Sequence, residues 1–215
     1  MLKLYYSPGA CSLAPHIVLE ELGLPYELEL AAIAEGKTRT PEYLALNPKG
    51  RVPVLVTEEG DVLTEAPAIC WYLSRQASHP LLFPHDPLAA ARVLEWCNWL
   101  SGSLHAMAFG QLWRPARFAA EAETHAAIQA KGRADLLEHY ASIERKLTGR
   151  HWAVGNALTY VDAYLLVFYR WGERVGVDMR AGYAAWTEHA QRMHARPAVQ
   201  RALAQERISI WGRAA

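Results

Sequence analysis

The sequence predicts a protein of two parts, a small α/β unit followed by an all-helical region, and three observations lead to this prediction. Over about the first 75 residues, short segments of strand pattern alternate with short segments of helix pattern. Three prolines, Pro80, Pro84 and Pro87, then follow closely, as is typical of a linker. Beyond them every periodic segment is helical and no strand pattern returns. The expected divisions are an α/β domain at 1–77, a linker at 78–87 and a helical domain at 88–215.

The α/β part is expected to contain four strands and three helices. Gly23 ends the first helix, because glycine readily adopts the left-handed conformation found there. The turn at 58–61 pairs the last two strands as an antiparallel hairpin, and the first two strands with the helix between them form a βαβ crossover. The expected strands are 2–6, 26–30, 52–56 and 62–64, and the expected helices are 12–22, 41–46 and 65–75.

The helical part is expected to contain five helices. At the start of the third, Thr159 and Asp162 have the spacing of a capping box, with Leu158 as the apolar residue that precedes it. This motif stabilises a helix start, so we interpret it as structural. The expected helices are 88–108, 119–146, 160–175, 184–194 and 198–206.

Composition and charge exclude several classes of protein. The 22 basic residues balance the 22 acidic ones, which argues against a nucleic-acid binder or a polybasic membrane tether. No apolar run reaches the roughly 18 residues of a membrane span, and the first residues reach a turn too soon for a secretory signal. We therefore expect a soluble, cytoplasmic protein that binds neither nucleic acid nor membrane.

Common motifs for nucleotides, metals and hydrolysis are missing from the sequence. Residues 36–38 look like the end of a P-loop, but Ala31 stands where that motif needs glycine. No G-x-G-x-x-G, G-x-S-x-G or H-E-x-x-H pattern occurs. The three cysteines include no C-x-x-C pair, which argues against a disulfide scaffold and a finger-type zinc site. No metal is expected.

Cys11 is the first candidate for chemistry. It follows a Pro-Gly turn after the first strand and stands where the first helix begins. The free N–H groups and the dipole of a helix start stabilise an anion, so a thiolate on Cys11 or on a bound ligand would be favoured. The alternative is a small buried apolar residue, the commoner fate of a free cysteine. For Cys70 and Cys97, which lie inside expected helices, that alternative is preferred.

Two further candidates lie at the same edge of the α/β part. Pro53 cannot donate to a sheet, which leaves the backbone of Val52 free to pair with an extended peptide. The segment from Glu65 to Pro67 opens a helix whose free N–H groups could bind a carboxylate while the Glu65 side chain binds an ammonium. The alternative for the second segment is an ordinary helix start with a favourable acidic residue.

These features coincide in a recognisable set of motifs. The motifs are YSPGACSLAPH at 6–16, NPKGRVP at 47–53, LTE at 63–65, EW at 95–96 with His105, and LTYVDAY at 158–164. With them the sequence resembles a bacterial glutathione S-transferase, most closely the beta class. The resemblance implies a thioredoxin-like N-terminal domain followed by an all-helical C-terminal domain, a homodimer, and glutathione as co-substrate.

The resemblance also assigns roles to individual residues. Val52, held by a cis Pro53, would pair with the cysteinyl backbone of glutathione. Glu65 and the N–H of Ala66 would hold its γ-glutamyl end, although the family often has serine in place of Ala66. The implied catalytic residues are Cys11, His105 and Ser12. The implied glutathione-binding residues are Lys37 at the glycine carboxylate, Val52, Pro53, Glu65, Ala66, Ser103 near the sulfur, and Asn98 across the dimer interface.

The expected reaction is conjugation of the glutathione thiolate to a small apolar electrophile. Five side chains, Tyr6, Phe109, Leu112, Trp113 and Trp171, are candidates for the electrophile pocket. Three alternatives stay open. They are thiol-disulfide exchange or peroxidase activity through Cys11, a glutathione-dependent isomerase or dehalogenase, and a non-catalytic binding protein on the same scaffold.

Overall fold

The computed structural model describes residues 1–76 and 82–211, and its first part is built on a four-stranded mixed sheet. The strand order is β2-β1-β3-β4, with β1 parallel to β2 and antiparallel to β3. The hairpin of β3 and β4 is antiparallel, as predicted. The strands are β1 (Leu2–Tyr6), β2 (Tyr26–Leu30), β3 (Val54–Val56) and β4 (Val62–Thr64).

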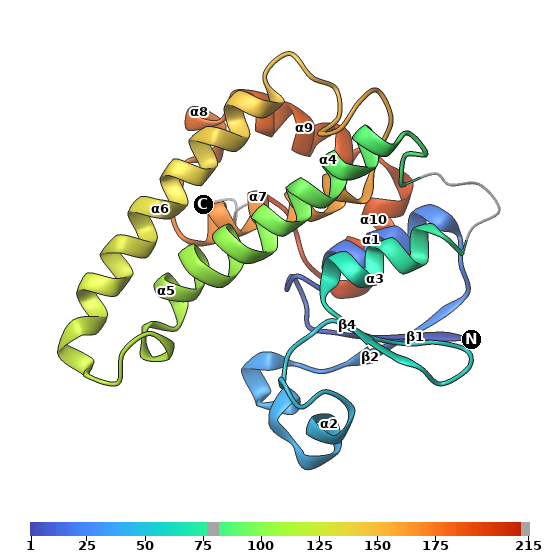
Figure 1. Cartoon of the computed structure of the whole chain (residues 1–215), viewed down its shortest axis with the longest axis horizontal. Coiled ribbons are helices and arrows are strands. Elements are labelled where there is room, and N and C mark those ends of the chain that lie inside the picture. Colours follow the sequence, from blue (N-terminus) through green and yellow to red (C-terminus); the bar gives the residue numbers. More distant parts are fainter. Residues whose placement is uncertain (77–81, 212–215) are drawn as a thin grey trace.

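Helices cover both faces of this sheet. Figure 1 shows α1 (Leu13–Leu22) and α3 (Ala66–Ser74) on the face toward the helical part, and α2 (Pro41–Leu46) on the other. The alternation of side chains along β1 explains this arrangement, because Leu4 joins the main core with α1 and α3 while Tyr5 packs with Tyr43 of α2. Gly23 ends α1 with a φ of 63°, as predicted. The α/β architecture and element order are confirmed.

The third strand begins later than predicted. The expected strand at 52–56 is observed as Val54–Val56, and the Val52–Pro53 peptide bond is cis. Proline lacks an N–H group for the ladder, so pairing starts only after it. Two short 3₁₀ turns that the sequence analysis missed, η1 (Ile33–Glu35) and η2 (Lys37–Arg39), connect β2 to α2.

The second part of the described chain is helical, as predicted, with differences in where helices begin and end. The first predicted helix extends beyond residue 108 and contains a π-helical segment. The elements are α4 (Pro87–Asn98), the π-helical η3 (Trp99–Phe109), α5 (Gly110–Trp113), the 3₁₀ turns η4 (Pro115–Arg117) and η5 (Ala122–Thr124), α6 (His125–Leu147), α7 (Tyr160–Arg174), α8 (Met179–Gly182), α9 (Ala184–His194) and α10 (Pro197–Glu206).

The predicted helix start at residue 119 is wrong, because α6 begins at His125. The alanines at 119 and 120 favour a helix by composition, but local bonds hold this segment as a turn. Thr124 donates its hydroxyl to the Glu121 carbonyl at 2.7 Å, and Nε2 of His125 lies 3.0 Å from the Ala119 carbonyl.

The expected linker at 78–87 lies only partly within the described residues, since 77–81 fall outside them. At its far end Asp86 caps α4 by accepting the Ala89 N–H at 2.8 Å, so Pro87 already belongs to the helix. Among the described residues, no helix combines the length and apolar character that crossing a membrane requires.

Helix α7 forms the centre of the helical part and is held at its start by Asp162. The predicted capping box of Thr159 and Asp162 is present. The fully buried Asp162 carboxylate accepts the N–H groups of Thr159 at 2.8 Å and Ala153 at 2.9 Å. It also lies 2.8 Å from Nε2 of the buried His189, which joins α7 to α9.

Candidate functional site

The loop between β1 and α1 is held in place by side chains of the helical part. Gly9 donates its N–H to Glu206 of α10 at 2.7 Å, and its carbonyl accepts a hydrogen bond from the Trp171 indole at 2.9 Å. Gly9 has a φ of 65°, and a Cβ there would lie 2.3 Å from the Arg170 guanidinium. Only glycine fits this position, which explains the Pro-Gly pair before Cys11.

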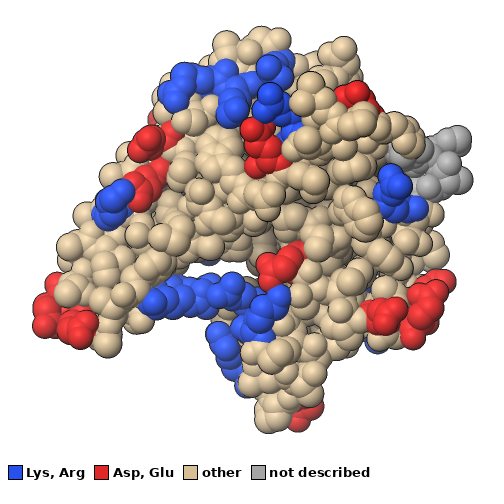
Figure 2. All heavy atoms as spheres, viewed as in Figure 1, with Lys and Arg blue, Asp and Glu red and all other residues tan. Residues whose placement is uncertain are grey.

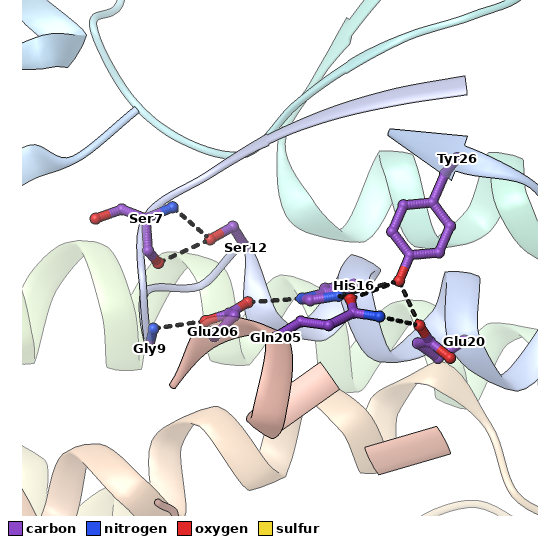
Figure 3. A network of polar contacts seen from close by, with 8 residues as sticks. All are labelled: Ser7, Gly9, Ser12, His16, Glu20, Tyr26, Gln205 and Glu206. Atoms are coloured by element: carbon purple, nitrogen blue, oxygen red, sulfur yellow. Dashed lines mark hydrogen bonds and ion pairs between the residues drawn. The ribbon is translucent and has the colours of Figure 1, made fainter. Parts of the chain in front are cut away.

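Glu206 also joins this loop to α1 through His16 (Figure 3). Nδ1 of His16 donates to one Glu206 oxygen at 2.9 Å while the other oxygen holds Gly9. Nε2 of His16 lies 2.7 Å from the side-chain oxygen of Gln205. His16 and Glu206 are both buried, so α10 is attached to the start of the first helix. The sequence analysis missed this network, whose only signal was His16 within the first motif.

Ser12, expected to be catalytic, is fully buried in the same loop. Its hydroxyl donates to the Ser7 carbonyl and accepts the Ser7 N–H, both at 3.2 Å. These bonds close the turn on itself and occupy the hydroxyl as both donor and acceptor. The geometry therefore favours a structural role for Ser12, stabilising the loop that carries Cys11.

Cys11 faces the cis peptide rather than open solvent. Its side chain is 9% exposed, and Sγ donates to the Val52 carbonyl at 3.3 Å. Burial raises the pKa of the Cys11 thiol to about 12, which outweighs the lowering by nearby backbone and arginine charges. A thiol that donates to a carbonyl is also stabilised in its neutral form. Of the two expected places for a thiolate, Cys11 or a bound ligand, this burial favours the ligand, because in the chain without ligand the helix start does not offset the loss of water around Cys11.

All three thiols are expected to be unreactive in the folded protein. Cys11, Cys70 and Cys97 are buried, and burial raises the pKa of each. Since the thiolate is the nucleophile, iodoacetamide at about pH 8 should leave all three unmodified in buffer and modify all three in guanidinium chloride. Mass spectrometry counts the added groups. Stoichiometric labelling of Cys11 in the native protein would contradict the assignment of a neutral thiol.

The backbone around Val52 is fixed from the side of α2. Tyr43 donates its hydroxyl and Asn47 its amide to the Arg51 carbonyl, each at 2.8 Å. Val52 is buried and is followed by the cis Pro53 that the family resemblance implied. The NPKGRVP motif therefore supplies its own support for the segment next to Cys11.

Glu65 stands at the start of α3 in an unusual backbone conformation. Its φ is 73°, a region that residues other than glycine rarely adopt and that occurs preferentially at functional sites. Its side chain is 61% exposed and lies 2.5 Å from Nζ of Lys49, which also donates to Thr64 at 2.7 Å. Ala66 follows as the first residue of α3. The sequence analysis missed both the Lys49 ion pair and the positive φ.

His105 lies on the π-helical segment η3 with its ring against Trp171, the ring centroids being 4.8 Å apart. Burial lowers the pKa of His105 to about 4, and the positive charges of Arg114 and Arg51 lower it further. The negative charge of Glu65 raises the pKa of His105. The same three charged residues act on Cys11, so Cys11 and His105 lie within range of the same charges, with His105 neutral at physiological pH.

The remaining expected binding residues lie nearer the surface. Lys37 on η2 and Asn98 at the end of α4 are exposed, and Ser103 on η3 is half-buried. Their side chains make no hydrogen bond or ion pair with other residues of the described ranges. The structure thus brings Cys11 into contact with Val52 and puts both Cys11 and His105 within range of the Glu65 charge. Among the described residues, the side chains of Lys37, Asn98 and Ser103 are left without a polar partner.

Aromatic rings form one wall beside His105. The ring centroids of Phe109, Trp113 and Trp171 lie 4.6–5.1 Å from one another. Phe109 and Trp171 are buried, so Trp113, which is 41% exposed, is the ring of this wall that a ligand can reach. Two other pocket candidates lie elsewhere. Tyr6 packs beside His16, at 6.1 Å between ring centroids, and Leu112 packs against the main core.

No group of three or more His, Cys, Asp or Glu side chains within residues 1–76 and 82–211 is placed to hold a metal ion.

Comparison with known proteins gives concordant results. Residues 9–76 match the family model of the glutathione S-transferase N-terminal domain, and residues 104–197 match that of the C-terminal domain. The chain is 35% identical over 207 residues to glutathione S-transferase GstA of Escherichia coli O157:H7, covering 95% of this chain and 98% of that protein.

Solved structures extend this similarity to the fold. A glutathione transferase homologue from Sulfitobacter with bound glutathione has a TM-score of 0.90 at 32% identity, covering 95% of this chain and 98% of that one. A bacterial beta class glutathione S-transferase of Sphingomonas chungbukensis has a TM-score of 0.84 at 32% identity, covering 96% and 100%.

Proposed function

The chain belongs to the glutathione S-transferase family, and on this premise we propose that it binds reduced glutathione and transfers its thiolate to a small electrophile. The observation that carries the proposal is the contact of the buried, neutral thiol of Cys11 with the Val52 carbonyl before the cis Pro53, within range of the Glu65 charge. The backbone of Val52 and the start of α3 then serve as the two ends of a peptide-binding edge.

In this proposal glutathione lies along the cis peptide. Its cysteinyl backbone pairs with Val52, beside Pro53, since a carbonyl oxygen has a second lone pair beyond the one that Cys11 uses. Its γ-glutamyl carboxylate meets the N–H of Ala66, and its ammonium meets Glu65, which it shares with Lys49. Lys37 is assigned to the glycine carboxylate, Ser103 to the side of the sulfur, and Asn98 to glutathione in the partner subunit.

The proposed chemistry stabilises the glutathione thiolate rather than one on Cys11. With a pKa of about 12, Cys11 keeps its proton, and when glutathione binds the S–H turns from the Val52 carbonyl to donate to the glutathione sulfur. His105, with a pKa of about 4, is too weak a base to take the thiol proton, so that proton leaves to water and the neutral imidazole positions the sulfur. The thiolate then attacks the electrophilic carbon, forming the C–S bond, and a halide leaves with its electron pair.

This arrangement favours conjugation over disulfide exchange or peroxidase activity through Cys11. Exchange of that kind needs a cysteine thiolate, and the burial that raises the Cys11 pKa suppresses it. The aromatic wall of Phe109, Trp113 and Trp171 supports an electrophile with an apolar body.

Steady-state assays with reduced glutathione test the proposal. We expect turnover of 1-chloro-2,4-dinitrobenzene and little turnover of hydroxyethyl disulfide. Cys11→Ala should lower kcat/KM for the aryl halide by about tenfold, because it removes one donor to the thiolate, and should move the rising limb of the pH profile upward by about one pH unit. Rapid disulfide turnover that vanishes in Cys11→Ala would instead assign the site to exchange.

A homodimer is also part of the proposal. Large apolar side chains are exposed on consecutive elements of one region, with Val62 on β4, Trp71 on α3 and Leu94 on α4, and exposed apolar groups of this kind are typical of subunit interfaces. Light scattering should give twice the mass of one chain, and a monomer at micromolar concentration would refute the dimer.

We also propose a cytoplasmic location, to be checked by cell fractionation. The proposed domain boundaries, 1–77, 78–87 and 88–215, are to be checked by limited proteolysis.

A further inference from the structure

We propose that the electrophile accepted by this site carries an acidic group, a carboxylate or a comparable anion, which Arg114 and Arg117 bind. The inference rests on the proposed glutathione transfer and specifies its second substrate. It follows from a local cluster of positively charged side chains, which the net charge of zero for the whole chain does not reveal.

Four arginines from distant parts of the chain meet at the site. Arg39 and Arg51 belong to the α/β part, whereas Arg114 and Arg117 belong to the segment after α5. They are close enough that Arg39 and Arg51 lower the pKa of both Arg114 and Arg117. Figure 2 shows Lys and Arg side chains gathered across the hollow between the end of the long helices and the sheet part, although the whole chain has no net charge.

This charge is not neutralised by the protein itself. Among the described residues, no carboxylate forms an ion pair with Arg39, Arg51, Arg114 or Arg117, and their guanidinium groups make no hydrogen bond. Glu65, whose charge acts on Cys11 and His105, is already paired with Lys49. All four arginines are exposed, and for Arg114 the part of its surface that the protein covers still contributes most to the lowering of its pKa. Like charges held together without a partner are unfavourable, so the arrangement fits an anionic ligand.

Glutathione alone does not account for all four arginines. In the proposed binding mode, one of its carboxylates meets the start of α3 and the other meets the cations of the α/β part, which include Lys37, Arg39 and Arg51. Arg39 is fixed on that side, because its guanidinium lies against Gly50, where a Cβ would come within 2.7 Å of Nη1. Arg114 and Arg117 lie on the opposite side, toward the helical part, and remain for the second substrate.

The surroundings of Arg114 describe the rest of that substrate. Arg114 directly follows Trp113, whose ring packs with Phe109 and Trp171 next to His105. An aromatic or unsaturated body would stack on the exposed ring of Trp113, which the two buried rings hold in place, while its acidic group reaches the arginines. The chemical class is therefore an unsaturated or aryl electrophile with a carboxylate.

Ethacrynic acid and its methyl ester make a matched pair of probes, since the acid lies far from the reacting alkene. In both, the glutathione sulfur adds to the terminal alkene carbon, the π electrons move to the carbonyl oxygen, and the resulting enolate takes up a proton equivalent to the one lost by the thiol. No leaving group or oxidant is involved. The two probes thus undergo the same reaction and differ only in whether they present a negative charge to the arginines.

The measurement is kcat/KM for both probes in the wild type, Arg114→Gln, Arg117→Gln and the control Arg145→Gln, which removes an exposed charge near the other end of α6. We expect the wild type and the control to prefer the acid by at least about tenfold, and each site variant to lose most of that preference while turnover of the ester persists. Equal kcat/KM for acid and ester in the wild type overturns the inference. The inference is also overturned if both site variants keep the wild-type preference for the acid. It is overturned as well if the only effect of the two variants is weaker binding of glutathione.

If neither probe is turned over, the proposed transfer fails and the inference is still tested by binding. Purified glutathione conjugates of the acid and of the ester can be titrated while Trp fluorescence is followed. Binding of the acid conjugate at least about tenfold tighter, with the difference lost in Arg114→Gln and Arg117→Gln, supports an anion site. Equal binding of the two conjugates overturns it.

Discussion

Replacing Asp162 by alanine is expected to lower the free energy of unfolding by about 3–5 kcal/mol, because it leaves several buried hydrogen-bond donors unpaired at about 1–3 kcal/mol each. The carboxylate is fully buried and serves the N–H groups of Thr159 and Ala153 together with His189. Alanine would leave all three without a partner at the centre of the helical part. Urea unfolding followed by circular dichroism measures the change.

The matched control is Asp178→Ala. Asp178 also caps a helix, accepting the Ala181 N–H at 3.0 Å, but it is exposed, so about 1 kcal/mol is expected. Asp162→Asn retains side-chain hydrogen bonding and should fall between the two, which provides a folded variant if alanine prevents folding. Equal decreases in the free energy of unfolding for Asp162→Ala and Asp178→Ala would show that burial of the Asp162 network adds nothing to stability.

Replacing Glu65 by glutamine is expected to weaken the binding of reduced glutathione by about ten- to a hundredfold, the range for losing a hydrogen bond to a charged group. The side chain is exposed, so the free energy of unfolding should change little. Isothermal titration measures the affinity. Glu59→Gln, an exposed glutamate in the hairpin turn, is the control and should bind as the wild type does.

The Lys49 ion pair allows the Glu65 prediction to be tested in the opposite direction. If the glutathione ammonium shares the Glu65 carboxylate with Lys49, then Lys49→Met should strengthen binding by a few fold, because the competing cation is gone. Normal affinity in Glu65→Gln would remove the γ-glutamyl assignment, whatever the result for Lys49→Met.

Local patterns predicted most of the fold. The bounds of β1, β2, α2 and α9 follow from periodicity and from residues such as Gly23 and Pro41, whose conformational preferences act within a few positions. The prediction of helix bounds failed where contacts with distant residues or local hydrogen bonds override composition, as in the segment before His125. The family resemblance, not periodicity, supplied the cis bond at Pro53.

The candidate site residues can be read from the sequence, whereas the electrostatics of the site cannot. Cys11, Val52 and Glu65 lie in short motifs, so their positions could be read along the chain. The neutral state of Cys11 depends on burial by the folded chain, and the arginine cluster joins Arg51 to Arg114. Such properties arise only when segments far apart in sequence meet, and a single sequence contains no signal for them.

The bond between Gly9 and Glu206 has a consequence for how the protein is made. The two residues are 197 positions apart, and the bond fixes the turn that leads to Cys11. During synthesis the sheet and its first helix leave the ribosome early, because domains form from the N-terminus as the chain grows. The turn nevertheless lacks its last hydrogen-bond partner until α10 has emerged. A ribosome that stops before Glu206 therefore releases a chain whose sheet can form but whose turn before Cys11 lacks the Glu206 hydrogen bond.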